Sequence, residues 1–358
     1  MGVKIFKDTK VFVACPANAA TGGPELLHQL VDALRNKLGV DAYLYYYRYF
    51  KLLNRTPVHP AYQSYNLPYV LSIKKEEDNE KNILIVSEVL SGLSLLPKFK
   101  NIRKGVWFLG VDAYYYSRVK NPFFLFKKAI NKILMKMNCL PFFSLENEKF
   151  FKKLTIKYNY KNDPLLALSD FYVVNSFRGL KWFSQLKPIY YIPDYYVSPQ
   201  FYEYANKVDW SKKENMVVYN PKKDFFTKKL IKIAKDITFV PLINMTREKV
   251  INTLLRAKVY VDFGNFPGPE RIPKEAVLMG CCVITSRRGC ANFYEDVPIP
   301  EEYKIEAIDK NFSKIISKIK ECFLNYELRF KDFEEFRKRV ILAPQRFIED
   351  LKKIFQKI

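Results

Sequence analysis

The sequence predicts an α/β protein with two doubly wound domains, each built on a parallel sheet. Three observations support this class. The chain has 358 residues, which is too long for one ordinary core and suits two domains. Strand-like apolar runs alternate with helix-like segments in both halves, without a fixed-period repeat. Residues 259–289 read as strand, loop, helix and strand, and a parallel pair of strands needs such a crossover.

The first half begins with a strand at 11–15, a loop of small residues at 17–23 and a helix from Pro24 to about Leu38. Further β-branched and aromatic runs predict more strands, with helices between them. The strands are expected at 42–47, 82–86, 104–109, 171–175 and 189–192, and the helices at 164–169 and 177–186. The three-glycine dinucleotide fingerprint is absent, so a nicotinamide site is poorly supported.

The second half repeats the alternation after a polar segment at 200–215, which is typical of a linker. Its strands are expected at 216–219, 238–242, 259–263 and 281–285, and its helices at 224–234, 246–257 and 273–279. Thr246 is the expected N-cap of one helix, and Gly280 the stop of another. Three helices are expected at 312–323, 326–343 and 345–358, with a break at Pro344.

The charge and composition of the chain limit the classes of partner that we expect it to bind. The 60 Lys and Arg residues exceed the 37 acids, giving a net charge of +23, which favours a polyanion, an anionic membrane face or a phosphorylated ligand. The six cysteines show no metal-site spacing, so we expect reduced thiols. We see no signal peptide or membrane-spanning run, and therefore expect a cytoplasmic protein.

A basic, aromatic insertion is expected at 114–161. Its helix begins at Asn121-Pro122 and carries an apolar face, with most lysines elsewhere on its surface. Two interpretations stay open. The apolar face packs on the protein, as in most amphipathic helices. Alternatively, residues 121–161 lie on an anionic membrane, which would place the protein peripherally on the inner face of the plasma membrane.

The stretch 259–289 resembles the donor-nucleotide region of GT-B glycosyltransferases, which have two Rossmann-like domains. In that family a Glu followed by Ala, early in the helix, often binds the nucleotide ribose, and Glu275-Ala276 matches it. Pro267 stands where the pattern often has a second Glu, and Glu270 is the nearby substitute. Two further stretches resemble the family, namely the loop 21–25 and Val111-Asp112 after Trp107. An ordinary βαβ unit with a polar loop is the alternative.

The resemblance implies roles for residues in the first half. Asp112 follows a strand end, where ligands of open parallel sheets bind, and is the candidate general base for an acceptor hydroxyl. A helix or turn cap is the other interpretation of this Asp. Gly22 and Gly23 would let the backbone approach donor phosphates or acceptor, unless they merely serve a turn with positive φ.

The donor would lie mainly on the second half. Glu275 would bind the ribose, and lysines with Arg271 would stabilise the departing diphosphate. The remaining donor-binding candidates are Glu270, Gly264, Asn265, Asn220, Lys222 and Lys223. Arg287 and Arg288 are candidates for phosphate or acceptor contact, with solvated arginines as the default interpretation. We expect neither a metal nor another cofactor.

The fold implied by the resemblance is GT-B-like, with two parallel sheets facing a central cleft and a C-terminal helix crossing back to the first domain. The expected boundaries are 1–200 for the acceptor-side domain, 201–340 for the donor domain and 341–358 for the helix. The expected function is sugar transfer from a nucleotide-activated donor to a growing bacterial surface glycan or lipid-linked acceptor. A basic nucleic-acid-binding protein and a nucleotide-sugar epimerase are the alternatives, although no nucleic-acid motif occurs and no nucleic-acid partner is expected.

Overall fold

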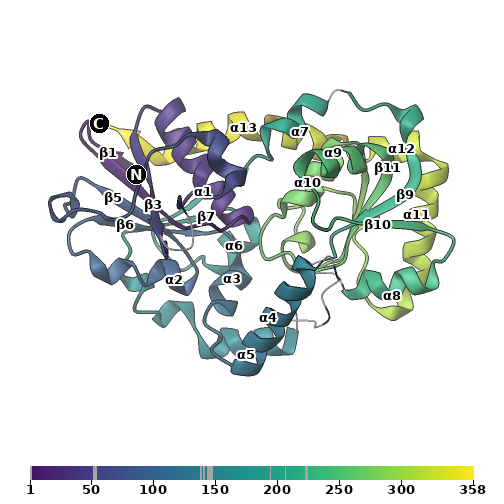
Figure 1. The fold of residues 1–358 in the computed structure, drawn as a ribbon, viewed down its shortest axis with the longest axis horizontal. Coiled ribbons are helices and arrows are strands. Elements are labelled where there is room, and N and C mark those ends of the chain that lie inside the picture. Colours follow the sequence, from purple (N-terminus) through teal and green to yellow (C-terminus); the bar gives the residue numbers. More distant parts are fainter. Residues whose placement is uncertain are drawn as a thin grey trace. The chain divides into compact units, whose positions relative to one another are not determined.

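The computed structural model of the chain describes residues 2–50, 55–137, 139, 142, 148–193, 195–205, 207–221 and 225–358. The chain divides into two compact units (Figure 1). Unit 1 comprises Met1–Arg118, Lys153–Tyr195 and Pro344–Ile358, and unit 2 comprises Val119–Lys152 and Tyr196–Ala343. Residues 119–152 thus group with unit 2, and the boundaries drawn from the sequence at 200 and 340 stay predictions.

Unit 1 is built on a seven-stranded parallel sheet in the order β4-β3-β2-β5-β6-β7-β8 (Figure 1). The strands are β2 Lys10–Pro16, β3 Asp41–Tyr47, β4 Tyr69–Val70, β5 Ile83–Ser87, β6 Arg103–Phe108, β7 Phe171–Val174 and β8 Ile189–Tyr191. The central strands are almost wholly buried, as their continuous apolar runs predict for a sheet covered on both faces. Only the two-residue β4 was not expected.

The connecting helices of unit 1 are short. They are α1 Gly22–Asp32, α2 Leu90–Leu93, α3 Val111–Tyr116 and α6 Phe177–Trp182. A π-helical turn over Ala33–Lys37 extends α1, and Gly39 follows with φ +59°. The helix predicted at 164–169 is wrong, because only the 3₁₀ turn Leu166–Leu168 forms there. The Leu166 carbonyl accepts the Tyr172 hydroxyl at 2.7 Å rather than continuing a helical ladder.

The two chain ends pair in unit 1, which the sequence did not predict. Strand β1 Val3–Ile5 lies parallel to β13 Phe355–Lys357 in a separate two-stranded sheet. The helix before β13 also packs here, since its Phe347 ring stacks on Trp107 of β6 with centroids 6.4 Å apart. The predicted helical end at 355–358 is therefore wrong, because strand pairing with the N-terminus competes with the helix.

The predicted helix break at Pro344 is also wrong. Helix α13 runs without interruption from Glu334 to Ile354, and α12 Tyr326–Lys331 precedes it. Proline lacks the N–H that would bond to the carbonyl four residues earlier. That carbonyl belongs to Val340 and accepts the Tyr202 hydroxyl at 3.2 Å. A distant side chain thus supplies the hydrogen bond that the proline removes.

Unit 2 contains a four-stranded parallel sheet in the order β10-β9-β11-β12. The strands are β9 Glu214–Tyr219, β10 Thr238–Pro241, β11 Ala257–Asp262 and β12 Cys282–Thr285. The helices around this sheet are α8 Phe225–Ile233, α9 Arg247–Arg256, α10 Arg271–Leu278 and α11 Phe312–Leu324 (Figure 1). The strand, loop, helix and strand predicted for 259–289 are confirmed as β11, α10 and β12, and Gly280 follows α10 with φ +84°.

Two segments remain, namely the predicted linker and the predicted basic insertion. The segment 200–215, predicted as a linker, instead contains most of helix α7 Pro199–Tyr204, whose Phe201 is only 1% exposed and joins the core of unit 2. The predicted basic helix is α4 Pro122–Lys136, and α5 Glu148–Lys157 follows it. Several predicted insertion residues, at 138, 140, 141 and 143–147, lie outside the described residues.

Candidate functional site

The loop after β11 in unit 2 is fixed to the ends of two neighbouring strands. Asp262 ends β11, and its Oδ1 accepts the Gly264 N–H at 3.0 Å. Ser286, which follows β12, donates its hydroxyl to the Gly264 carbonyl at 3.0 Å. The predicted site residues Gly264 and Asn265 therefore lie at the carboxyl edge of the sheet, where α/β proteins bind ligands.

A second close approach holds the far end of this loop. The Cys290 N–H donates to the Phe266 carbonyl at 2.8 Å. Gly289 has φ +60°, and a Cβ there would lie 2.1 Å from that same carbonyl oxygen. Only glycine fits such a left-handed, crowded position. The β12 loop is thus locked onto the β11 loop.

Helix α10 begins directly after this loop and carries the predicted donor residues. Glu270 is its N-cap residue. The Arg271 Nε lies 2.8 Å from the Glu275 Oε1, one turn along the helix, with the side chains 29% and 4% exposed, respectively. The helix N-terminus carries a partial positive charge, and Arg271 adds a full one. This arrangement suits an anionic ligand beside Arg271.

The other predicted residues of unit 2 have different outcomes. Asn220 follows β9 and is buried. Lys222 and Lys223 lie outside the described residues. Arg287 forms an ion pair with Glu301, and the Arg288 Nε lies 3.8 Å from Glu148. Both side chains are more than a third exposed, at 38% and 39%, which agrees with the default interpretation of solvated arginines.

Asp112 lies in the first turn of α3, after β6 in unit 1, and is only 2% exposed. The Arg178 guanidinium donates to both of its carboxylate oxygens, at 2.7 and 3.2 Å. Arg178 belongs to α6, which follows β7. The ion pair thus ties together two adjacent loops at the carboxyl edge of this sheet.

Glu88 is a second carboxylate at this edge and was missed as a site residue. It follows β5, is 1% exposed, and accepts the Gly110 N–H on Oε1 at 3.0 Å. Burial raises the pKa of Glu88 to about 7. A carboxyl with this pKa near a sheet edge is typical of acid–base residues. In the sequence, Glu88 only interrupts an apolar run, so no local signal distinguished it.

Gly22 and Gly23 are the first residues of α1, after β2. Neither has positive φ, so the alternative that they serve a left-handed turn is wrong. A Cβ at Gly22 would meet nothing within 4 Å, whereas one at Gly23 would lie 3.2 Å from the Leu109 side chain. The space beside Gly22 is open.

Two groups of predicted residues therefore form. One surrounds the ends of β11 and β12 in unit 2, with Gly264, Asn265, Glu270, Arg271 and Glu275 as members. The other lies at the carboxyl edge of unit 1, with Gly22, Gly23 and Asp112. Each group lies where the parallel strands of its own sheet end.

Comparison with known proteins rests on structure. No family model matches the sequence, and no similar curated protein was found. Sucrose-phosphate synthase from Thermosynechococcus elongatus matches with a TM-score of 0.58 and 12% identity, covering 96% of this chain and 98% of that one. Anabaena HepE in complex with UDP-glucose matches with a TM-score of 0.51 and 11% identity, covering 96% and 98%. The chain has the GT-B fold.

The O-GlcNAc transferase of Thermobaculum terrenum also matches, with a TM-score of 0.53 and 10% identity over 96% of this chain and 66% of that one. At such identities the likeness establishes the GT-B fold alone. Within that fold, units 1 and 2 are the two Rossmann-like domains, each with its own parallel sheet.

The described part of the chain contains neither a cluster of metal ligands nor a membrane-spanning helix. No group of three or more His, Cys, Asp or Glu side chains there could hold a metal ion. None of the helices in the described ranges is both long and apolar enough to cross a bilayer.

Proposed function

We propose that this protein is a glycosyltransferase that moves a sugar from a nucleotide-activated donor to a growing bacterial surface glycan or lipid-linked acceptor, without a metal. The observation that carries the proposal is the Arg271–Glu275 pair at the start of α10, beneath a loop fixed to two strand ends in a GT-B fold. Structurally similar proteins support it, since one is a sucrose-phosphate synthase and another, HepE, forms a complex with UDP-glucose.

The donor would bind at the carboxyl edge of unit 2. Glu275, whose Oε1 is paired with Arg271, would accept a ribose hydroxyl. Arg271 and the N–H groups that begin α10 would stabilise the charge that develops on the departing diphosphate. Because these donors are fixed before the reaction, they need no reorganisation during it.

The acceptor hydroxyl needs a base if the reaction inverts the anomeric centre, and unit 1 offers two carboxylates. Asp112 was predicted for this role, and the Arg178 guanidinium donates to both of its carboxylate oxygens. Glu88 accepts backbone N–H groups, among them that of Gly110 at 3.0 Å, and its pKa of about 7 suits proton transfer near neutral pH. Turnover by Asp112→Asn and Glu88→Gln distinguishes the two. The base is the residue whose variant loses the acidic limb of the pH–rate profile, because a base acts only after losing its proton.

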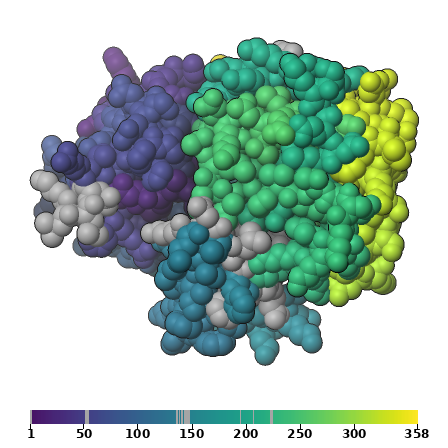
Figure 2. Space-filling view, turned by 45° about the vertical axis from the view of Figure 1, so that its right-hand side comes forward, coloured from purple at the N-terminus to yellow at the C-terminus, as the bar shows by residue number. Residues whose placement is uncertain are grey.

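A lipid-linked acceptor would bring the protein to an anionic membrane face, and α4 is suited to that contact. Phe123, Phe126 and Ile133 are between 57% and 65% exposed on this helix, and Lys128 and Lys132 are exposed as well. Figure 2 shows atoms of this blue-green segment on the molecular surface. Exposed rings among lysines are typical of interfacial helices. Sedimentation with anionic vesicles should weaken in Phe123→Ser/Phe126→Ser, and unchanged sedimentation would reject this surface.

The donor assignment is tested by calorimetric titration of the full chain with UDP, ADP, GDP and UDP-glucose. We expect at least one nucleotide to bind saturably, and Glu275→Ala to weaken that binding by roughly tenfold, because a charged hydrogen bond is lost. Glu327→Ala, which changes an exposed glutamate of α12, is the matched control and should bind as the parent does. Equal affinity in the Glu275 variant would remove the donor site from α10.

A further inference from the structure

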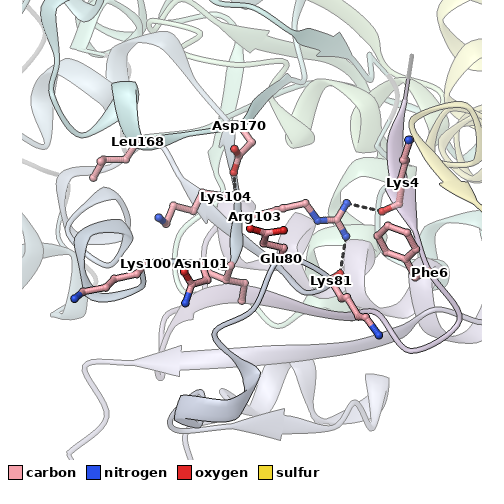
Figure 3. Close-up of a pocket in the computed structure, with 11 residues that line it drawn as sticks. Lys4, Phe6, Glu80, Lys81, Lys100, Asn101, Arg103, Lys104, Leu168 and Asp170 are labelled. Carbon is pink, nitrogen blue, oxygen red and sulfur yellow. Dashed lines mark hydrogen bonds between the residues drawn. The ribbon is translucent and has the colours of Figure 1, made fainter.

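A pocket lies in unit 1, at the sheet edge opposite to Asp112. Its volume is about 510 Å³, and it forms where the loops before β5, β6 and β7 approach the chain beside β1 (Figure 3). This volume lies within the usual range for small-ligand sites. Arg103 begins β6 and Phe108 ends it, so roughly 17 Å of strand separates this pocket from the loop of Asp112.

Lys104 is the first unusual feature of the pocket. Its side chain lines the pocket, and the residue is only 8% exposed. Its backbone N–H donates to Asp170 Oδ2 at 2.6 Å, but its ammonium has no hydrogen bond or ion pair with any residue that the structure describes. The stem of the side chain is buried, but its Nζ is not among the fully buried nitrogen atoms, and an anion bound in the pocket would pair with this charge.

Arg103 is the second unusual feature of the pocket. Its Nη1 and Nη2 donate to the carbonyls of Lys4 and Lys81, both at 2.6 Å, which fixes the guanidinium in place (Figure 3). Its Nε is buried and has no acceptor within the described ranges. Burial lowers the pKa of Arg103, whereas the charge of Asp170 raises it. The guanidinium therefore presents a positive charge that no carboxylate contacts directly.

The remaining walls define the shape of a ligand. Lys100 and Lys104 extend to the same side of the pocket in Figure 3, beside Asn101. Phe6 contributes a partly exposed ring, whose centroid lies 5.5 Å from the Arg103 Cζ. Glu80 also lines the pocket. The site thus combines cations, an apolar ring, an amide and carboxylates.

We propose that this pocket binds a small phosphorylated sugar or polyol. The phosphate lies between the Lys100 and Lys104 ammonium groups, and its two negative charges offset the unpaired cations. The hydroxyls donate to Glu80 and Asn101, and the carbon skeleton packs on Phe6. A ligand that is anionic along its whole length, such as a nucleic acid or polyphosphate, is disfavoured because Glu80 and Asp170 would repel it. This site is independent of the donor loop in unit 2.

The test is calorimetric titration of the full chain with glucose 6-phosphate at physiological salt, with glucose and inorganic phosphate as comparison probes. Glucose 6-phosphate should bind saturably, phosphate more weakly and glucose not at all. Lys104→Met should weaken binding by roughly tenfold or more, and Lys100→Met less, since Lys100 is exposed. Lys98→Met removes the same charge from an exposed lysine outside the pocket and should leave the affinity unchanged.

Three outcomes would overturn the proposal. Glucose 6-phosphate fails to bind saturably at millimolar concentration, or Lys98→Met weakens it as much as Lys104→Met, which would show unspecific attraction by net charge. The third is loss of binding in Glu275→Ala with retention in Lys104→Met, which would place the phosphate at the donor loop. Urea unfolding of both lysine variants confirms that they are folded, and Lys100→Met keeps the test valid if Lys104→Met is not.

Discussion

The amino edges of the two sheets each carry an almost completely buried lysine, and the two lysines have different surroundings. Lys213 precedes β9 in unit 2 and is 7% exposed, while Lys104 is the second residue of β6 in unit 1 and is 8% exposed. The Lys213 ammonium donates to three carbonyls, those of Leu254, Ala257 and Met279, at 3.1, 2.8 and 2.6 Å. The Lys104 ammonium has no such acceptor within the described part of the chain.

This contrast shows that the role of a charged side chain is indicated by its hydrogen-bond partners rather than by its exposed fraction. An ammonium has three protons, and Lys213 uses all of them on carbonyls at the ends of α9 and α10, where the helix dipoles are negative. Its ammonium group is therefore fully engaged in hydrogen bonds within the fold. The Lys104 charge remains available to a ligand. The carboxylates of unit 1 show a related contrast, because Asp112 is held by Arg178 whereas Glu88 accepts a backbone N–H.

The largest effect should come from Lys213→Met. This change removes three charged hydrogen bonds to buried carbonyls, of which those of Leu254 and Ala257 keep only the weak thiol donor of Cys281, so we expect the free energy of unfolding to fall by roughly 5 kcal/mol. Lys104→Met should change it by less than about 1 kcal/mol, since the Lys104 ammonium lines the pocket and makes no hydrogen bond or ion pair with the described residues, while the methionine keeps the apolar stem. Urea unfolding at neutral pH measures both.

Lys212→Met is the matched control for Lys213, because Lys212 is adjacent in sequence and 78% exposed. Its unfolding midpoint should equal that of the parent. If Lys104→Met proved as destabilising as Lys213→Met, the distinction between a structural and an available lysine would be wrong.

Arg178→Met should have the next largest effect. It leaves the carboxylate of Asp112 buried without its guanidinium, and breaking such a pair costs about 3 to 4 kcal/mol. Arg35→Met is a sharp control, because the Arg35–Asp41 pair has the same 2.7 Å separation but side chains 36% and 42% exposed. That pair should contribute below about 1 kcal/mol. Equal losses in urea unfolding would show that burial does not set the strength of these pairs.

Much of this architecture was predictable, because its signals are local. The strand-like run and the glycine-rich loop at 259–269 predicted β11 and the site loop, and Gly280 ends α10 as expected. Parallel topology then placed Gly264 and Glu275 at one sheet edge without any knowledge of side-chain contacts. Thr246 caps α9, its Oγ1 accepting the Lys249 N–H at 3.3 Å.

The missed features depend on residues far apart in the chain. Pro344 stays inside a helix because Tyr202, from a segment predicted as a linker, bonds to Val340. Arg178 was not linked to Asp112, since their pairing arises from the adjacency of β6 and β7. The role of Lys213 likewise depends on the ends of two helices that follow it. No window of sequence contains both partners of any of these contacts.

The smallest effect is expected for Glu88→Gln, and it depends on pH. The pKa of Glu88 is about 7 in the folded protein, against an ordinary value of 4.5. Between these values the folded state binds more protons, so stability is full below pH 4.5 and is lost as the pH rises through 7, by roughly 3 kcal/mol in all. Glu88→Gln should remove this slope and be more stable than the parent at pH 8 by about 3 kcal/mol, while differing little near pH 4. Urea unfolding across this range measures the effect, with the exposed Glu76→Gln as control.

Parallel pH curves for parent and Glu88→Gln would mean that Glu88 is ionised in the folded protein, and that it is held by its N–H contacts as firmly as Asp112 is by Arg178.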